Sequence, residues 1–262
     1  MDLDLSGKHA LVCGASEGIG HAAAIELALL GANVTVLARR EDALRGVAAT
    51  LPCHKAGQKH GWISADANET SALSARVHEL AAGTPVHILV NNSGGPPGGR
   101  AVEADAEAYL AAFRQHLLGN QALVQAVVAG MQSAQWGRIV NVISTSVKEP
   151  IANLGVSNTV RGAVASWSKT LSRELGGFGI TVNNVLPGYT RTRRLDQILD
   201  DRVASTGKDR DQIAATMLAS VPAARFAEAT EIAAAIAFLS SPAAAYINGV
   251  SLAVDGGRMQ SI

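Results

Sequence analysis

The sequence has few cysteines, few aromatic residues and no excess of charge of either sign. The two cysteines, Cys13 and Cys53, are too few for a disulfide framework or a four-ligand zinc site. Basic and acidic residues number 22 each, so the composition predicts no electrostatic surface for nucleic acid. These absences exclude several classes of secreted, zinc-stabilised and nucleic-acid-binding protein.

Long hydrophobic runs are also missing. No apolar stretch approaches the roughly 20 residues that span a bilayer. The first ten residues, MDLDLSGKHA, lack the apolar core of a signal peptide. We therefore expect a cytoplasmic protein that makes no contact with a membrane.

The hydrophobic residues, 48% of the chain, form short runs that alternate with longer helical patterns. Most runs are apolar throughout, as strands covered on both faces require. The pattern predicts strands at 9–13, 33–38, 61–65, 86–91, 138–143, 180–186 and 250–254, and helices at 18–30, 69–82, 104–133, 156–176 and 229–239. This order predicts a single α/β domain over residues 1–262, a Rossmann-type doubly wound parallel sheet of about seven strands with helices on both faces.

The segment 188–222 interrupts this alternation. It is charged and amphipathic, and it is either a lid over a site or a surface excursion. It contains a run of arginines, at 191, 193 and 194, which either meets an anion or lies solvated in a loop or at a helix end.

A glycine-rich stretch, CGASEGIG at 13–20, follows the first predicted strand and opens the first predicted helix. Gly14, Gly18 and Gly20, with Ser16 and Ile19 between them, let the backbone approach a pyrophosphate closely. The N-terminus of the helix then offers free N–H groups to the phosphates. The stretch predicts a dinucleotide site.

The end of the second strand indicates which dinucleotide. An acidic residue there binds the ribose 2′-hydroxyl of NAD in such folds. This chain has Arg39 and Arg40 instead, and arginine suits the 2′-phosphate of NADP. NADP(H) is therefore favoured, with NAD(H) as the alternative. Glu17 argues the other way because its carboxylate would repel a phosphate, and the two arginines alternatively only begin a solvated helix.

These and later motifs resemble the short-chain dehydrogenase/reductase family, in particular its 3-oxoacyl-carrier-protein reductases. Their order and spacing cover nearly the whole chain. The resemblance implies that further residues bind the cofactor: Asp66 and Ala67 near the adenine, Asn92 and Gly94 of the motif NNSG, Pro187, Gly188 and Thr192 of the motif PGYTRT. It also implies a homo-oligomer, most simply a tetramer, that acts on a small carbonyl substrate.

The catalytic set of that family is Asn, Ser, Tyr and Lys. Ser144 matches the family serine. The family tyrosine falls on Ser157, the lysine on Arg161, and the asparagine on His116, with Asn120 one turn later. Three of the four positions therefore differ from the family.

The replacements change the acid chemistry of the predicted site. In the family, the tyrosine gives a proton to the carbonyl oxygen and the lysine lowers the pKa of that tyrosine. A serine hydroxyl is a much weaker acid. Arginine holds its proton firmly, but Arg161 can still bind the ribose hydroxyls of the cofactor as the family lysine does. Tyr189, close to where the family places the nicotinamide, and His116, whose pKa is expected to suit proton transfer near neutrality, are candidate proton donors. Alternatively, Tyr189 is a pocket wall and His116 a hydrogen-bonded interior residue.

Three functions fit these observations. The first is an NADP(H)-dependent reductase of a small or acyl carbonyl compound, which uses Ser144 and a relocated acid. The second is a nucleotide-binding protein without catalysis, acting as a sensor or a partner subunit. The third, a lyase resembling the halohydrin branch of the superfamily, ranks last because that branch keeps the tyrosine and loses the glycine-rich loop, whereas this chain does the reverse.

Overall fold

The computed structural model describes residues 1–261 and contains one seven-stranded parallel sheet in the order β3-β2-β1-β4-β5-β6-β7. The fold predicted from the sequence is confirmed, and the predicted strands match within two residues at each end. The strands are β1 (His9–Cys13), β2 (Asn33–Ala38), β3 (His60–Ser64), β4 (Ile88–Asn91), β5 (Gly137–Val142), β6 (Ile180–Pro187) and β7 (Ser251–Val254).

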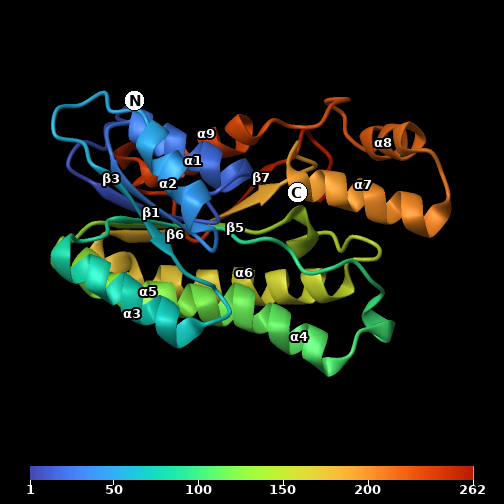
Figure 1. Ribbon diagram of the computed structural model, residues 1–262, viewed down its shortest axis with the longest axis horizontal. Coiled ribbons are helices and arrows are strands. Elements are labelled where there is room, and N and C mark those ends of the chain that lie inside the picture. The colour runs from blue at the N-terminus through green and yellow to red at the C-terminus, as the bar shows by residue number, and fades with distance from the viewer. Residues whose placement is uncertain (262) are drawn as a thin grey trace.

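Two layers of helices cover the sheet, one on each face (Figure 1). One layer contains α1 (Gly18–Leu29), α2 (Glu41–Thr50) and α9 (Ala229–Ser240), and the other contains α3 (Thr70–Gly83), α5 (Gly119–Ser133) and α6 (Gly155–Leu175). Each layer buries its own apolar core against the strands. The predicted helices did not include α2, although its two buried residues, Leu44 and Val47, stand three apart on one helix face.

The long helix predicted at 104–133 is interrupted. It consists of α4 (Ala106–Phe113), a π-helical turn (Arg114–Leu118) and α5. The turn coincides with a close approach, since a Cβ at Gly119 would lie 2.9 Å from the carbonyl oxygen of Ala67. Such π-helical turns are frequent at functional sites, and this one holds His116.

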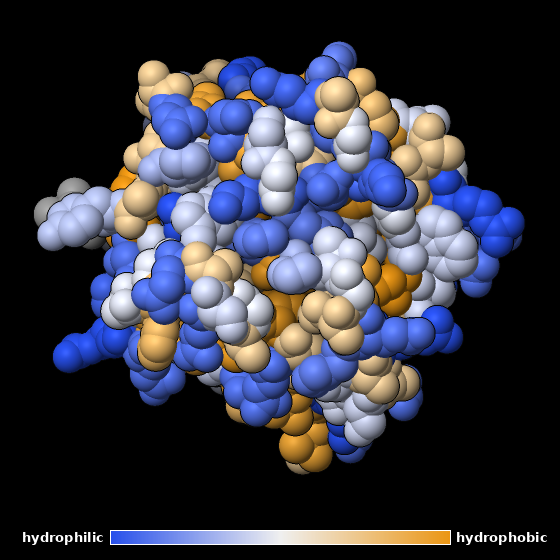
Figure 2. Space-filling view, turned by 90° about the vertical axis from the view of Figure 1, so that its left-hand side faces the viewer, coloured by the Kyte–Doolittle hydropathy of each residue, from blue (hydrophilic) through white to orange (hydrophobic). Residues whose placement is uncertain are grey.

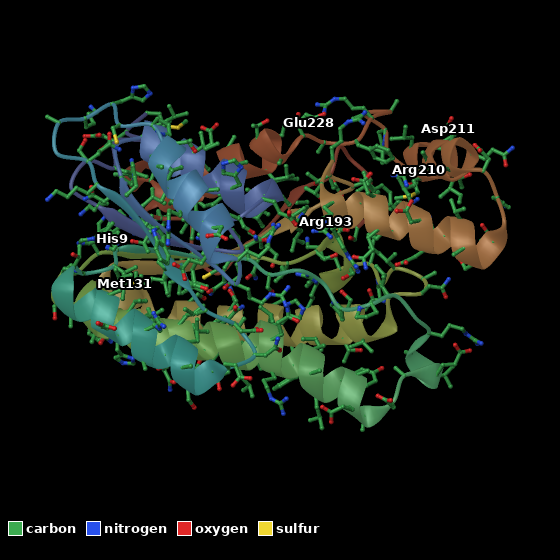
Figure 3. All side chains as sticks on the ribbon, viewed as in Figure 1. His9, Met131, Arg193, Arg210, Asp211 and Glu228 are labelled. Carbon is green, nitrogen blue, oxygen red and sulfur yellow. The ribbon has the colours of Figure 1, made fainter. Side chains whose placement is uncertain are left out.

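The excursion at 188–222 folds into two helices, α7 (Arg193–Thr206) and α8 (Arg210–Leu218). Gly207, at a φ of 66°, ends α7 in the left-handed conformation. Arg210 pairs with Asp196 at 2.7 Å and also with Asp200, which ties the two helices together. In Figure 3 Arg210 lies towards the opposite end of the molecule from His9, the first residue of β1, and Arg193 lies between them.

Short 3-10 turns occupy several connections: Ala101–Glu103, Thr145–Val147, Gly176–Phe178 and Pro242–Ala244. On the side opposite α7 and α8, hydrophilic residues cover most of the face and hydrophobic residues lie between them in small groups (Figure 2). Among residues 1–261, no helix is long and apolar enough to cross a membrane. The strands are all parallel, so they end on the same side of the sheet, where α7 begins after β6. That side therefore holds the loops that follow the strands.

Candidate active site

The glycine-rich loop connects β1 to α1 through glycine positions that leave no room for a side chain. Gly14 and Gly18 both have a φ of 59°. A Cβ at Gly14 would lie 2.6 Å from the carbonyl oxygen of Asn92, and one at Gly20 would lie 2.3 Å from the carbonyl oxygen of Gly14. The glycines are therefore required by close packing as well as by the turn.

The N-terminus of α1 keeps its backbone N–H groups available. No side chain caps this terminus. The Asn92 side chain donates to the carbonyl oxygens of Cys13 and Gly14, at 3.3 Å each, and so fastens the loop to the end of β4. An anion placed at this terminus would meet free donors and the positive end of the helix dipole.

The two arginines after β2 have different surroundings. Arg40 Nη2 lies 2.9 Å from a carboxylate oxygen of Glu17 and 3.5 Å from Ser16 Oγ. Among the ion pairs of residues 1–261, none includes Arg39. The charge of Glu17, which argued against a phosphate, is thus neutralised by Arg40, and Arg39 keeps its guanidinium for another partner.

Two further segments predicted to touch the cofactor lie beside the loop. Thr192 precedes α7, and its methyl carbon would lie 3.3 Å from a Cβ at Gly18, so this segment meets the glycine-rich loop. Gly188 packs tightly against Asp255, to which a Cβ would approach within 2.7 Å. On the other side, the Asp66 carboxylate accepts hydrogen bonds from Asn68, which orders the loop after β3.

Ser157 and Arg161 lie one turn apart on the buried face of α6, as their spacing predicted. Arg161 Nη1 donates to the carbonyl oxygens of Val142 at 3.3 Å and Ile143 at 2.9 Å. Burial, and then the charge of Arg194, lowers the pKa of Arg161 to about 10, so the guanidinium stays charged at neutral pH. No hydrogen bond of Ser157 Oγ occurs within the part of the chain that is described.

Ser144 directly follows the carbonyl groups that Arg161 binds. Its Oγ accepts a hydrogen bond of 3.1 Å from the backbone N–H of Ser146, at the start of a 3-10 turn. The hydroxyl proton of Ser144 thus remains available to a ligand. The structure brings Ser144 and Arg161 to one point, at the carboxyl end of β5.

His116 is buried, with an exposed fraction of 3%. Its Nδ1 shares a hydrogen bond of 2.8 Å with Ser93 Oγ, and its Nε2 is buried without a partner. Burial and the charges of Arg161 and Arg194 lower the pKa of His116 to about 3. The expectation that its pKa suits proton transfer near neutrality is therefore wrong, because the imidazole is neutral at pH 7 and lies beside two cations.

Tyr189 is directed by its contacts towards α7 and α8. Its ring packs edge-on against Phe226, with centroids 6.2 Å apart, and Arg258 lies 4.9 Å above it. It packs against the apolar cluster that joins these two helices to each other. These contacts match a pocket wall, and its use as a proton donor stays a prediction.

Arg194 joins the site although the sequence left its role open. Of the three arginines in the run, Arg191 and Arg193 are exposed and Arg194 is half-buried. Arg194 Nη2 donates to the carbonyl oxygen of Pro96 at 2.7 Å, so it reaches from α7 to the loop after β4. Ser93, in the same loop, was also missed. The signal for Arg194 was the arginine run itself, and the signal for Ser93 was the motif NNSG at the end of a predicted strand.

Comparisons with known proteins agree with this geometry. Residues 14–258 match the family described as Enoyl-(Acyl carrier protein) reductase. The chain is 35% identical over 257 residues to the 3-oxoacyl-[acyl-carrier-protein] reductase FabG of Vibrio cholerae, covering 97% of this chain and 98% of the relative.

Solved structures give the same picture. The structure resembles L-sorbose reductase from Gluconobacter frateurii complexed with NADPH and L-sorbose, with a TM-score of 0.92, 28% identity and full coverage of both chains. It also resembles YwfH, an NADPH-dependent reductase of bacilysin biosynthesis, with a TM-score of 0.92 and 27% identity over 98% of this chain and 100% of that one.

Proposed function

Because the chain belongs to the short-chain dehydrogenase/reductase family, we propose that it is an NADP(H)-dependent oxidoreductase which interconverts a carbonyl group and an alcohol at an atypical active site. Relatives named as 3-oxoacyl-carrier-protein reductases and structural neighbours that hold NADPH support this proposal. A 3-oxoacyl compound is one candidate substrate.

The observation that carries the proposal is a loop and a helix terminus that together fit a dinucleotide. The loop of Gly14, Gly18 and Gly20 and the uncapped N-terminus of α1 fit a pyrophosphate. Arg39, which has no carboxylate partner among residues 1–261, fits the 2′-phosphate that distinguishes NADP from NAD. A chain that does not bind a dinucleotide would gain nothing from keeping these features together.

The proposed chemistry relies on charge rather than on a strong acid. Bound NADPH supplies a hydride to the carbonyl carbon. The Ser144 hydroxyl donates a hydrogen bond to the carbonyl oxygen, and the charge of Arg161 stabilises the negative charge that develops there. Ser157 is too weak an acid to act as the family tyrosine does. The final proton therefore comes from water, and turnover is slow compared with an enzyme that has a tyrosine.

The test is to measure cofactor binding and turnover separately. Fluorescence titration should give tighter binding of NADPH than of NADH. A panel of ketones and an acetoacetyl thioester, followed by nicotinamide absorbance, should identify a reduced substrate. Tighter binding of NADH, or no binding of either, would contradict the proposal.

A second function is favoured by one observation. Neither His116, with its pKa of about 3, nor the buried Arg161 can release a proton near neutral pH. A protein that binds NADPH and uses its binding as a signal needs no such proton. Tight NADPH binding together with no reduction of any carbonyl compound in the panel would identify this function instead.

A further inference from the structure

The loop after β4 lies against two arginine side chains that come from different helices. A Cβ at Gly95 would lie 3.5 Å from Arg161 Nη2 and 3.4 Å from Arg194 Nη2. The two guanidinium groups are therefore neighbours. None of the ion pairs among residues 1–261 includes either of them.

Each guanidinium uses only part of its hydrogen-bonding capacity on the protein. Arg161 uses Nη1 on two carbonyl oxygens, and Arg194 uses Nη1 on Gln197 and Nη2 on Pro96. A guanidinium carries five N–H groups, so donors remain on both side chains. Arg161 is only 8% exposed. A buried charge of this kind is costly unless an anion accompanies it.

His116 gives an independent indication of a ligand at the same place. The residue is only 3% exposed, and its Nε2 has no hydrogen-bond partner among residues 1–261. It is close enough to Arg161 and Arg194 to feel both charges. Buried polar atoms are normally satisfied, so an orphaned ring nitrogen beside two unpaired cations points to a missing polar partner.

We propose that Arg161 and Arg194 bind a carboxylate of the substrate, so that the protein acts on an oxo acid or the corresponding hydroxy acid. This inference rests on the proposed oxidoreductase function. Two planar guanidinium groups match the fork of a carboxylate. The phosphates of the cofactor fit a separate site, at the glycine-rich loop. The thioester of a 3-oxoacyl compound is uncharged and so would not pair with Arg161 and Arg194.

The experiment measures binding without turnover. The protein is saturated with NADP⁺, which cannot reduce a ketone, and titrated by calorimetry with acetoacetate and levulinate and with their neutral amides. Both acids should bind at least about tenfold more tightly than their amides. Arg194→Gln should weaken binding of the acids by about tenfold to a hundredfold, the loss expected for charge-assisted hydrogen bonds, and leave the amides and NADP⁺ unchanged.

Arg193→Gln is the matched control. It removes the same charge from the same turn of α7, but Arg193 is exposed, and none of the ion pairs or side-chain hydrogen bonds among residues 1–261 includes its guanidinium. It should leave acid binding within about twofold. Equal loss in both variants would mean only a general effect of charge and would overturn the proposal.

Two other results would also overturn it. Equal affinity for acids and amides would mean that the arginines stabilise only the charge that develops during reaction. Binding of acetoacetate to the free protein that NADP⁺ abolishes would assign the arginines to the cofactor's phosphates. Failure of NADP⁺ to bind would contradict the proposed function, whereas discrimination between acids and amides by the free protein would still support the anion site.

Discussion

Replacing Ser157 by tyrosine together with Arg161 by lysine should raise carbonyl reduction. The two positions lie one turn apart on the buried face of α6, which is the arrangement that a tyrosine and its activating cation require. A lysine at position 161 keeps a positive charge beside the carbonyl groups of Val142 and Ile143. That charge lowers the pKa of a neighbouring phenol from its ordinary value of about 10.

The size of the gain follows from what the phenol adds. General acid catalysis contributes about 10²- to 10⁴-fold, or about 3 to 5 kcal/mol of the activation barrier. Against this, Ser157 is 6% exposed, and a ring in a packed environment costs about 1–3 kcal/mol of folding stability. The net expectation is a less stable and faster enzyme. His116→Asn, added as a third change, makes room if the ring of His116 obstructs the new side chain.

The matched control carries phenylalanine in place of tyrosine at position 157, with the same lysine at 161. Both variants bear the same packing cost, and only one has a hydroxyl. NADPH oxidation with an acetoacetyl thioester and with a simple ketone is measured for each, alongside thermal unfolding. Equal rates for the two folded, NADPH-binding variants would refute the reasoning that the site lacks an acid.

Further predictions concern the cofactor, stability and assembly. Arg39→Ala should weaken NADPH binding by about tenfold to a hundredfold and hardly affect NADH, as titration would show. Arg161→Ala should weaken NADPH binding about tenfold, and Ser157→Ala should weaken it less than about twofold. If Ser157→Ala abolished a robust turnover, the Ser157 hydroxyl would be an essential catalytic group, contrary to this account. The pKa of His116 is about 3 in the folded protein and 6.5 in the unfolded chain, so between these values the unfolded chain binds the extra proton. The free energy of unfolding should therefore fall as pH drops from 6.5 towards 3, by up to about 1.4 kcal/mol per pH unit. His116→Asn should flatten this dependence in urea unfolding. We expect a tetramer in light scattering and a smaller species for Leu110→Glu, since Leu110 is 56% exposed on α4; a monomeric parent would contradict this.

The sheet could be predicted from the sequence because buried parallel strands are apolar throughout and glycine marks the turns between strand and helix. The features that could not be predicted from the sequence depend on few contacts or on contacts between distant residues. The helix α2 was missed because it is short and buries only Leu44 and Val47 of its ten residues, although both lie on one face. The π-helical turn at 114–118 arises where Gly119 meets Ala67, a contact between residues far apart in the chain.

The candidate site was predicted in part. Helical spacing placed Ser157 and Arg161 on one face, and the strand end placed Ser144 beside them. The pKa of His116 was mistaken because it depends on burial and on two cations from other helices. Arg194 was indistinguishable from its exposed neighbour Arg193 until the fold brought it against the loop of Pro96.

The most direct test of the account follows the hydride itself. The protein is incubated with NADPH deuterated at C4 of the nicotinamide and with carbonyl compounds that include acetoacetate, and the products are analysed by mass spectrometry. The account predicts an alcohol that carries deuterium on the former carbonyl carbon, formed more slowly by the Arg161→Ala variant. Saturating binding of NADPH with no deuterium in any alcohol would contradict the claim that this protein is an oxidoreductase.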